Sequence, residues 1–297
     1  MNLVFDFGNT TQKMAAMLSG EVVDMVKKTK IEIKDIERFL EKYNPEQAIL
    51  SSVVNERAEV ADFLEKRIFL LKFSHKTPIP IQNEYKTPIS LGTDRLACAV
   101  AAASLFPKTA VLVLQMGTCI TSDFITEAGV YKGGSISPGL EMRLNALHHF
   151  SAKLPLVSCN TSDKGACPLV KTVEQAVRLR SLPEKQRRLS GLVLSGAEVA
   201  EVSLPFGEGW GGVQKNFIGT TTEESILTGI IYGIADETNG LIARYRNAFP
   251  ALKIILTGGD AKLFENKIKN AIFVNDHLVL VGLNIILNYN VENQKNK

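Results

Sequence analysis

The sequence lacks an apolar run long enough to cross a membrane. Its two longest apolar segments, residues 97–106 and 278–287, fall short of the about 18 residues that a membrane helix needs. The N-terminus carries Asp6 inside its first apolar segment and has no basic lead-in, so no secretory signal is expected. We therefore expect a cytoplasmic protein with no membrane partner.

Cysteine is scarce, and neither sign of charge dominates. Four cysteines (Cys98, Cys119, Cys159 and Cys167) show no CxxC spacing, which favours buried reduced thiols over a disulfide framework or a zinc site. The 34 basic and 31 acidic residues leave a net charge of +3, too balanced to predict a nucleic-acid partner. A Walker A motif is also absent. With 45% apolar residues in a chain of 297, the composition indicates a globular protein of two ordinary domains.

What the chain does contain is one unit repeated: an apolar strand, a loop with glycine and threonine, and a second strand. The first copy spans residues 3–18 with Gly8 at the hinge, and the second spans 111–125 with Gly117. Such a hinge points backbone N–H groups and hydroxyls into one concavity, which suits phosphate oxygens. Two copies predict a duplicated fold that holds a nucleotide between its halves.

Strands and helices are expected to alternate between and after these hairpins. The last residues, 288–297, are polar and are expected to fray. We place a domain boundary near Lys108, which gives an N-terminal domain of residues 1–108 and a C-terminal domain of 109–297 with an insertion around 158–214. The hydrophobic pattern predicts helices over 34–43, 56–66, 94–106 and 223–246, the last capped by Thr222, and strands over 47–54, 68–73 and 253–256.

Asp6 lies at the end of the first apolar strand, where a carboxylate is costly unless it is paired or binds a metal. It could cap its own turn. Alternatively, it could anchor Mg²⁺ through water for a nucleotide whose phosphates lie over Gly8, Asn9 and Thr10. A third glycine-bearing junction, Thr257-Gly258-Gly259-Asp260, favours the second interpretation because it follows the two loops in order.

Asp94 lies in the sequence Gly92-Thr93-Asp94-Arg95 at a predicted helix start. Asp is favoured there by the helix dipole, but that explanation leaves the adjacent Arg95 unexplained. Behind a proline-bearing loop with Tyr85, the pair could instead form an acceptor site. Asp94 would accept a proton from an attacking hydroxyl, and Arg95 would bind a carboxylate or stabilise a transferred phosphoryl group. Both interpretations stay open at this point.

These segments together resemble the type III pantothenate kinase family, a member of the actin/hexokinase/Hsp70 nucleotide-binding superfamily. The resemblance implies an α/β fold of duplicated ribonuclease-H-like (actin/hexokinase-type) domains, with mixed sheets flanked by helices. It is carried by Asp6-Phe7-Gly8-Asn9-Thr10 with Lys13, Tyr85-Lys86-Thr87-Pro88, Gly92-Thr93-Asp94-Arg95, Gly117-Thr118-Cys119-Ile120-Thr121, residues 133–139, 152–156 and 219–226, and Leu256-Thr257-Gly258-Gly259.

The resemblance implies ATP-dependent phosphorylation of the primary hydroxyl of pantothenate to 4'-phosphopantothenate, the first step of coenzyme A biosynthesis. It implies a homodimer whose acceptor site is shared across the subunit interface. Asp94 would be the general base, and Asp6 would hold Mg²⁺. ATP would contact Asp6, Phe7, Gly8, Asn9, Thr10, Thr11, Gln12, Lys13, Gly117, Thr118, Gly258 and Gly259, and pantothenate would contact Tyr85, Gly92, Thr93, Asp94, Arg95 and Thr222.

The chain departs from the family pattern at two places. Gln115 stands where the family usually has the Asp that ligates a monovalent cation, and a neutral amide offers one carbonyl oxygen in its place. Our hypothesis is that activation by K⁺ or NH₄⁺ is weakened or absent while catalysis through Asp94 survives. The second departure is the stretch from Ser158 to Gln214, which is longer than the family's connection.

Two other functions compete with this one. A non-catalytic nucleotide-binding accessory protein of the same fold is favoured by Gln115, but Asp6, Asp94 and Arg95 are retained, and a loss of catalysis would more naturally show there. A kinase of the same superfamily acting on a sugar or a carboxylate is also compatible with the fold. Tyr85, the segment 92–95 and Thr222 favour pantothenate over these acceptors.

Overall fold

The computed structural model describes residues 1–52, 58–159, 217–268 and 273–295. The chain divides into two compact units, one made of Met1–Met142 with Ile234–Lys297 and the other of Arg143–Gly233, and each unit is described by itself. The boundary predicted near Lys108 stays a prediction. The insertion predicted around 158–214 also stays one, because nearly all of it lies outside the described residues.

The first unit contains a five-stranded sheet in the order β3-β2-β1-β4-β5. Strand β2 is antiparallel to both β1 and β3, whereas β4 pairs in parallel with β1 and β5 pairs in parallel with β4. The strands are β1 (Asn2–Phe7), β2 (Gln12–Leu18), β3 (Glu21–Lys28), β4 (Gln47–Ser52) and β5 (Phe69–Lys72).

The second sheet of this unit repeats the same topology in the order β11-β10-β7-β8-β9-β6. Strands β7, β8 and β9 are antiparallel, β10 and β11 extend the sheet in parallel from β7, and β6 is added in parallel to β9. The duplicated α/β fold expected from the sequence is thereby confirmed. The strands are β6 (Gln82–Asn83), β7 (Val111–Met116), β8 (Cys119–Ile125), β9 (Val130–Pro138), β10 (Lys253–Thr257) and β11 (Phe273–Val274).

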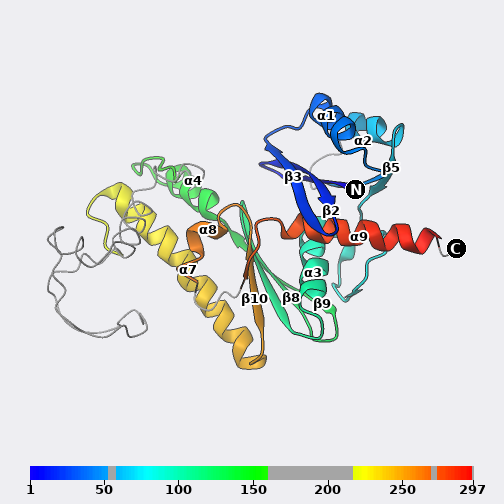
Figure 1. The fold of residues 1–297 in the computed structure, drawn as a ribbon. Helices are drawn as coiled ribbons and strands as arrows, with labels where there is room; N and C mark the ends of the chain where they lie inside the picture. Colours follow the sequence, from blue (N-terminus) through cyan, green and yellow to red (C-terminus); the bar gives the residue numbers. More distant parts are fainter. Residues whose placement is uncertain (53–57, 160–216, 269–272, 296–297) are drawn as a thin grey trace, which may run out of the picture. The chain divides into compact units, whose positions relative to one another are not determined.

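Helices cover both faces of the first sheet (Figure 1). On one face, α1 (Ile33–Tyr43) and α2 (Ala58–Glu65) bury a core with Leu3, Phe5 and Phe7 of β1. On the other face lies a central layer of α3 (Thr93–Leu105) and α9 (Leu278–Lys295). Residues of α3 and α9 share one apolar core with Val4 of the first sheet and with Val111 and Val113 of the second.

Strand alternation places two polar side chains toward this central layer. In β1, Val4 belongs to the core shared with α3 and α9, so Asp6, two residues on, points to the same face. In β7, Val111 and Val113 belong to that core, and Gln115 follows them on the same face. Asp6 and Gln115 are therefore duplicates: each is the fifth residue of a six-residue first strand.

Most predicted elements are present within two residues of their expected ends, and the differences have local causes. β3 was not predicted. Thr222, the predicted cap, is the first residue of α7 (Thr222–Ala248), and the capping residue is Thr221. Thr221 Oγ1 accepts the Glu224 N–H at 3.1 Å, and Glu224 Oε2 accepts the Thr220 N–H at 2.8 Å. The prediction that residues 288–297 fray is wrong for the described residues 288–295. Helix α9 continues to Lys295, and the Asn290 side chain donates a hydrogen bond to Pro78 O at 2.9 Å.

Two further helices complete the described chain, α4 (Leu140–Phe150) and α8 (Ala261–Phe264), with a short 3-10 turn at Pro88–Ser90. The helix that follows the glycine-bearing junction Thr257-Gly258-Gly259-Asp260 is only four residues long. Within the residues that the structure describes, no helix has both the length and the apolar character needed to span a membrane.

Candidate active site

The first loop is a tight turn between β1 and β2. The Gly8 N–H donates to Thr11 O at 3.1 Å, and Asn9 and Thr10 are exposed at the tip. The predicted nucleotide contacts stay a prediction, and two of the residues concerned have side chains that are engaged elsewhere. Phe7 is fully buried in the core, and Gln12 is buried with its Oε1 accepting the Ile31 N–H at 2.8 Å.

The second loop meets the first one, as the duplicated pattern predicts. The hydroxyls of Thr10 and Thr118 lie 3.0 Å apart, although the residues are 108 positions apart in the chain. The Gly117 N–H donates to Cys119 O at 3.1 Å and closes the second hairpin as the Gly8 bond closes the first. The structure therefore brings both predicted phosphate loops to one place.

The third glycine segment packs against the second loop backbone to backbone. Gly258 has φ +103°, and a Cβ there would lie 2.0 Å from Met116 O. The Asp260 N–H donates to the same carbonyl at 3.1 Å. Gly258 thus packs against the residue before Gly117, and only glycine permits this approach. A Cβ on the next residue, Gly259, would meet no atom within 4 Å.

Asp6 is a carboxylate in a poorly solvated position. Burial raises its pKa from 3.8 to about 6; the nearby charge of Lys13 lowers it, and that of Asp94 raises it. No hydrogen bond to this carboxylate occurs within the part of the chain that the structure describes. A desolvated carboxylate of this kind fits Mg²⁺, which uses one or two carboxylates together with substrate phosphates. The described residues contain no larger cluster of His, Cys, Asp and Glu that could hold a metal.

Asp94 lies in the first turn of α3, and the residues around it fix its carboxylate. A Cβ on Gly92 would lie 2.6 Å from Asp94 Oδ1, so the absence of a side chain at Gly92 leaves room for this oxygen. The other oxygen, Oδ2, accepts a hydrogen bond from Gln115 Nε2 at 3.3 Å. Thr93 is held by a 2.8 Å hydrogen bond to its hydroxyl from Ser51, at the end of β4.

Arg95 does not extend a free guanidinium, and its expected contact with the substrate stays a prediction. Its Nε and one terminal nitrogen donate to Asp123 Oδ1 at 3.0 and 2.7 Å, and the side chain is 6% exposed. Asp123, fully buried on β8, also accepts from Tyr131 at 2.6 Å and from Thr121 at 3.2 Å. Burial and the charge of Asp123 raise the pKa of Tyr131, so the phenol stays a donor.

Tyr85 lies beside this buried pair. Its ring centroid is 5.9 Å from the Arg95 guanidinium carbon and 6.1 Å from the Tyr131 ring. Gly133, with φ +95°, passes under the ring, and a Cβ there would lie 2.9 Å from Tyr85 Cδ2. Tyr85, Gly92, Thr93, Asp94 and Arg95 are therefore brought together around the start of α3. Thr222 belongs to the unit Arg143–Gly233.

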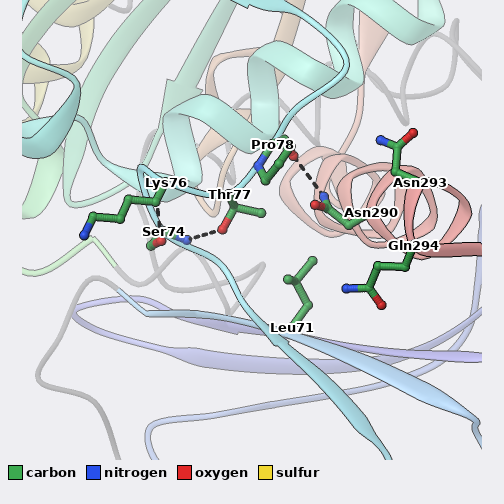
Figure 2. Close-up of a pocket in the computed structure, with 8 residues that line it drawn as sticks. All are labelled: Leu71, Ser74, Lys76, Thr77, Pro78, Asn290, Asn293 and Gln294. Carbon is green, nitrogen blue, oxygen red and sulfur yellow. Dashed lines mark hydrogen bonds between the residues drawn. The ribbon is translucent and has the colours of Figure 1, made fainter. Parts of the chain in front are cut away.

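A surface pocket of about 350 Å³ lies between the loop after β5 and the last turns of α9 (Figure 2). Asn290 and Pro78 are joined across it by a hydrogen bond. None of the predicted site residues lines this pocket, so it is no part of the candidate active site. Its lining residues are Leu71, Ser74, Lys76, Thr77, Pro78, Asn290, Asn293 and Gln294.

Sequence reasoning missed three members of the site. Asp123 could have been found, because it is a lone carboxylate in the predicted strand 120–125, as Asp6 is in its own strand. Tyr131 and Cys98 carry no comparable signal in the sequence. An aromatic residue on a strand and a cysteine on a small-residue helix both look like ordinary core positions.

The comparisons with known proteins agree with this geometry. A model of the type III pantothenate kinase family matches residues 2–179. The chain is 35% identical over 291 residues to the type III pantothenate kinase of Phocaeicola vulgatus, covering 98% of this chain and 99% of that one. It is 36% identical over 292 residues to that of Christiangramia forsetii, with coverage of 98% and 99%.

Among solved structures, one similar chain is a Campylobacter jejuni protein named for the Baf family of transcriptional activators. The TM-score is 0.50 at 18% identity, and the alignment covers 98% of this chain and 99% of that one. This likeness supports the fold alone.

Proposed function

This chain belongs to the type III pantothenate kinase family, and we propose that it transfers the γ-phosphoryl group of ATP to the primary hydroxyl of pantothenate, the first step of coenzyme A biosynthesis. Besides membership of this family, one observation in the structure supports the proposed reaction. Asp94, at the start of α3, lies beside Asp6 of the first loop strand and Gln115 of the second. A carboxylate is thus available next to the place where two phosphate loops meet.

The reaction follows from these positions. The acceptor hydroxyl oxygen forms a bond to the γ-phosphorus, the bond from that phosphorus to the bridging oxygen of ADP breaks, and the hydroxyl proton passes to the Asp94 carboxylate. Backbone N–H groups and hydroxyls of residues 9–11 and of Thr118 hold the phosphates, with Lys13 as the nearby cation, because the N–H groups of Gly8 and Gly117 close their own turns. Asp6 would hold Mg²⁺, which supplies neutralisation of phosphate charge when bound.

The pantothenate site is proposed around Tyr85, Gly92, Thr93 and Arg95, with Thr222 as a further contact. Because Asp123 holds the Arg95 guanidinium in one position and compensates its charge, Arg95 would act there as a fixed N–H donor. Tyr85 would supply an apolar face with a hydroxyl for the acceptor chain. A homodimer with a shared acceptor site and a cytoplasmic location complete the proposal. The free thiols Cys98 and Cys119 fit a reducing compartment.

A monovalent-cation site does not fit the residues at Gln115. The amide nitrogen, not the oxygen, faces Asp94, and the amide oxygen lies 3.6 Å from the Cys98 sulfur. We therefore propose that K⁺ or NH₄⁺ activation is weak or absent in this protein. The accessory-protein alternative is not favoured, because both carboxylates and the two loops are in place.

The test is pantothenate-dependent ADP formation by the purified protein with Mg-ATP, with and without K⁺ and NH₄⁺. We expect turnover in every salt, and Asp94→Asn should lower kcat by at least about 100-fold because the proton acceptor is lost. Asp62→Asn, an exposed change on α2, is the matched control. Tight ATP binding with no turnover in any salt would contradict the kinase. A strong requirement for K⁺ would contradict the proposal for Gln115.

A further inference from the structure

Gln115 occupies the place in the second half of the fold that Asp6 occupies in the first. Both side chains point from the fifth position of a first strand toward the start of α3, where Asp94 lies. A carboxylate at position 115 as well as at Asp6 would gather three negative charges around the first turn of α3, the third being Asp94. Like charges so close together repel. The chain has a neutral amide at this position instead.

The orientation of that amide is fixed from both ends. A carboxylate can only accept hydrogen bonds when ionised, so the amide nitrogen must face Asp94 Oδ2, at 3.3 Å. The amide oxygen then faces the Cys98 thiol, whose sulfur lies 3.6 Å away. Burial and the surrounding carboxylates raise the pKa of Cys98 well above its ordinary value, so the thiol keeps the proton that it donates. Asp94 and Cys98 are four residues apart, on one face of α3.

The neutral character of this partner matters for a general base. An Arg or Lys against Asp94 would orient it but would also make the carboxylate less basic. Among the described residues, no ion pair includes Asp94, and the adjacent Arg95 is turned to Asp123. A neutral N–H donor holds one oxygen while the other stays free to accept a proton.

We propose that Gln115 is the positioning residue of Asp94, and that Cys98 acts through Gln115 by fixing its amide. This inference rests on the proposed kinase function, and it assigns to this chain's own side chains the orientation of the proton acceptor. The hydrogen-bonded chain is Cys98 to Gln115 to Asp94. It joins the helix to the middle strand of the second sheet, where β8 and β10 flank β7 on either side.

Gln115→Met keeps the shape of the side chain and removes both hydrogen bonds. We expect kcat to fall by about 10- to 100-fold, with the KM values for pantothenate and ATP within about twofold of wild type, because only the position of the base changes. Gln47→Met is the matched control: Gln47 is also a half-buried strand glutamine, donates to Asn2 at 2.8 Å, and should leave kcat unchanged.

Variants of Cys98 distinguish a positioning role of Gln115 from a purely structural one, because the two roles predict different changes in kcat. Cys98→Ala should lower kcat several-fold in the wild-type background and should have no further effect in Gln115→Met. Cys98→Ser should retain activity, because the hydroxyl can donate to the same amide oxygen. An unchanged kcat in Gln115→Met, or an equal effect of Cys98→Ala in both backgrounds, would overturn the inference.

A measurement without turnover separates this inference from the proposed function. The Tm changes of Asp94→Ala and Gln115→Met should be non-additive in the double variant, because the two residues contact each other. Additive changes would show that the contact is absent and would overturn the inference even if the wild type is a kinase. A non-additive result in a protein that does not turn over pantothenate would instead overturn the proposed function.

Discussion

At the scale of one residue, Asp6 is a buried carboxylate that costs the folded protein stability. The side chain extends from a strand in which Leu3, Val4, Phe5 and Phe7 are apolar, and burial outweighs the favourable charge of Lys13. Proteins retain such a group where a ligand relieves the cost. In the proposed reaction, Mg²⁺ with the ATP phosphates would be that ligand.

The pKa of Asp6 predicts a pH dependence of stability. It is raised from 3.8 to about 6, so between pH 4 and 6 the folded protein keeps a proton that the unfolded chain releases. The free energy of unfolding should therefore fall as pH rises through this window. The cost, on the order of 3 kcal/mol, is complete above about pH 6 and absent below about pH 4.

Urea unfolding of wild type and Asp6→Asn, without nucleotide, at pH 4 and pH 7 checks this prediction. The variant should be more stable than wild type at pH 7 and equal to it at pH 4, and it should lose affinity for Mg-ATP. Asp62→Asn controls for the loss of a carboxylate at the surface. The same difference between wild type and Asp6→Asn at both pH values would show that Asp6 is normally solvated.

The buried pair of Arg95 and Asp123 shows the limit of reasoning from single residues. The sequence indicated correctly that Arg95 is unusual at a helix start, and it suggested a ligand as the reason. The structure places Asp123, 28 residues further along the chain, against the guanidinium. A lone carboxylate in an apolar strand marks Asp123 in the sequence, but no local pattern pairs it with Arg95, because the second sheet brings the two residues together.

At the scale of elements, the central layer depends on the close crossing of α3 and α9. A Cβ on Gly282 would lie 1.9 Å from Ala97 O, so the two helix backbones meet at this glycine. The approach places the start of α3 between the two sheets, with Asp94 near both loops. Small residues along α3 and Gly282 on α9 are therefore a requirement of the site, although none of them contacts a substrate.

Gly282→Ala should destabilise the protein by about 1–3 kcal/mol or more, because the added methyl group forces the two helices apart. Gly240→Ala is the matched control, also a glycine inside a helix but with no atom within 4 Å of its Cβ position. It should be neutral or stabilise the protein by about 0.5–1 kcal/mol through the better helix propensity of Ala. Urea unfolding compares the two variants. Equal effects would show that the helices do not cross so closely.

At the scale of the whole molecule, the proposed homodimer predicts a mass of twice 32.5 kDa in sedimentation velocity. Because the acceptor site is proposed to be shared, turnover per chain should fall on dilution as dimers dissociate. Assays over a concentration series, with the mass measured at each concentration, check this. Full turnover per chain at a concentration where the protein is monomeric would contradict the shared site.

The sequence by itself determined the duplicated topology and the place of both loops. Alternating apolar strands, glycine hinges and the flanking threonines are local signals, and each predicted its own turn. Helix α1 lies where the hydrophobic periodicity predicted it, because it buries one regular face. Strand β2 also lies where it was expected, although it buries residues on both of its faces. The carboxylates Asp6 and Asp94 were also found locally, since each stands out in an apolar or helix-start context.

Only the tertiary structure decided what these residues face. The contacts between Thr10 and Thr118, between Arg95 and Asp123, and from Gln115 to Asp94 join segments that the sequence separates. The end of α9 was also decided there, because Asn290 finds the carbonyl of Pro78 across the chain. Local patterns determine which face of an element is apolar. The packing of two sheets around α3 and α9 determines which polar groups meet, because hydrogen-bond partners are chosen by distance in space.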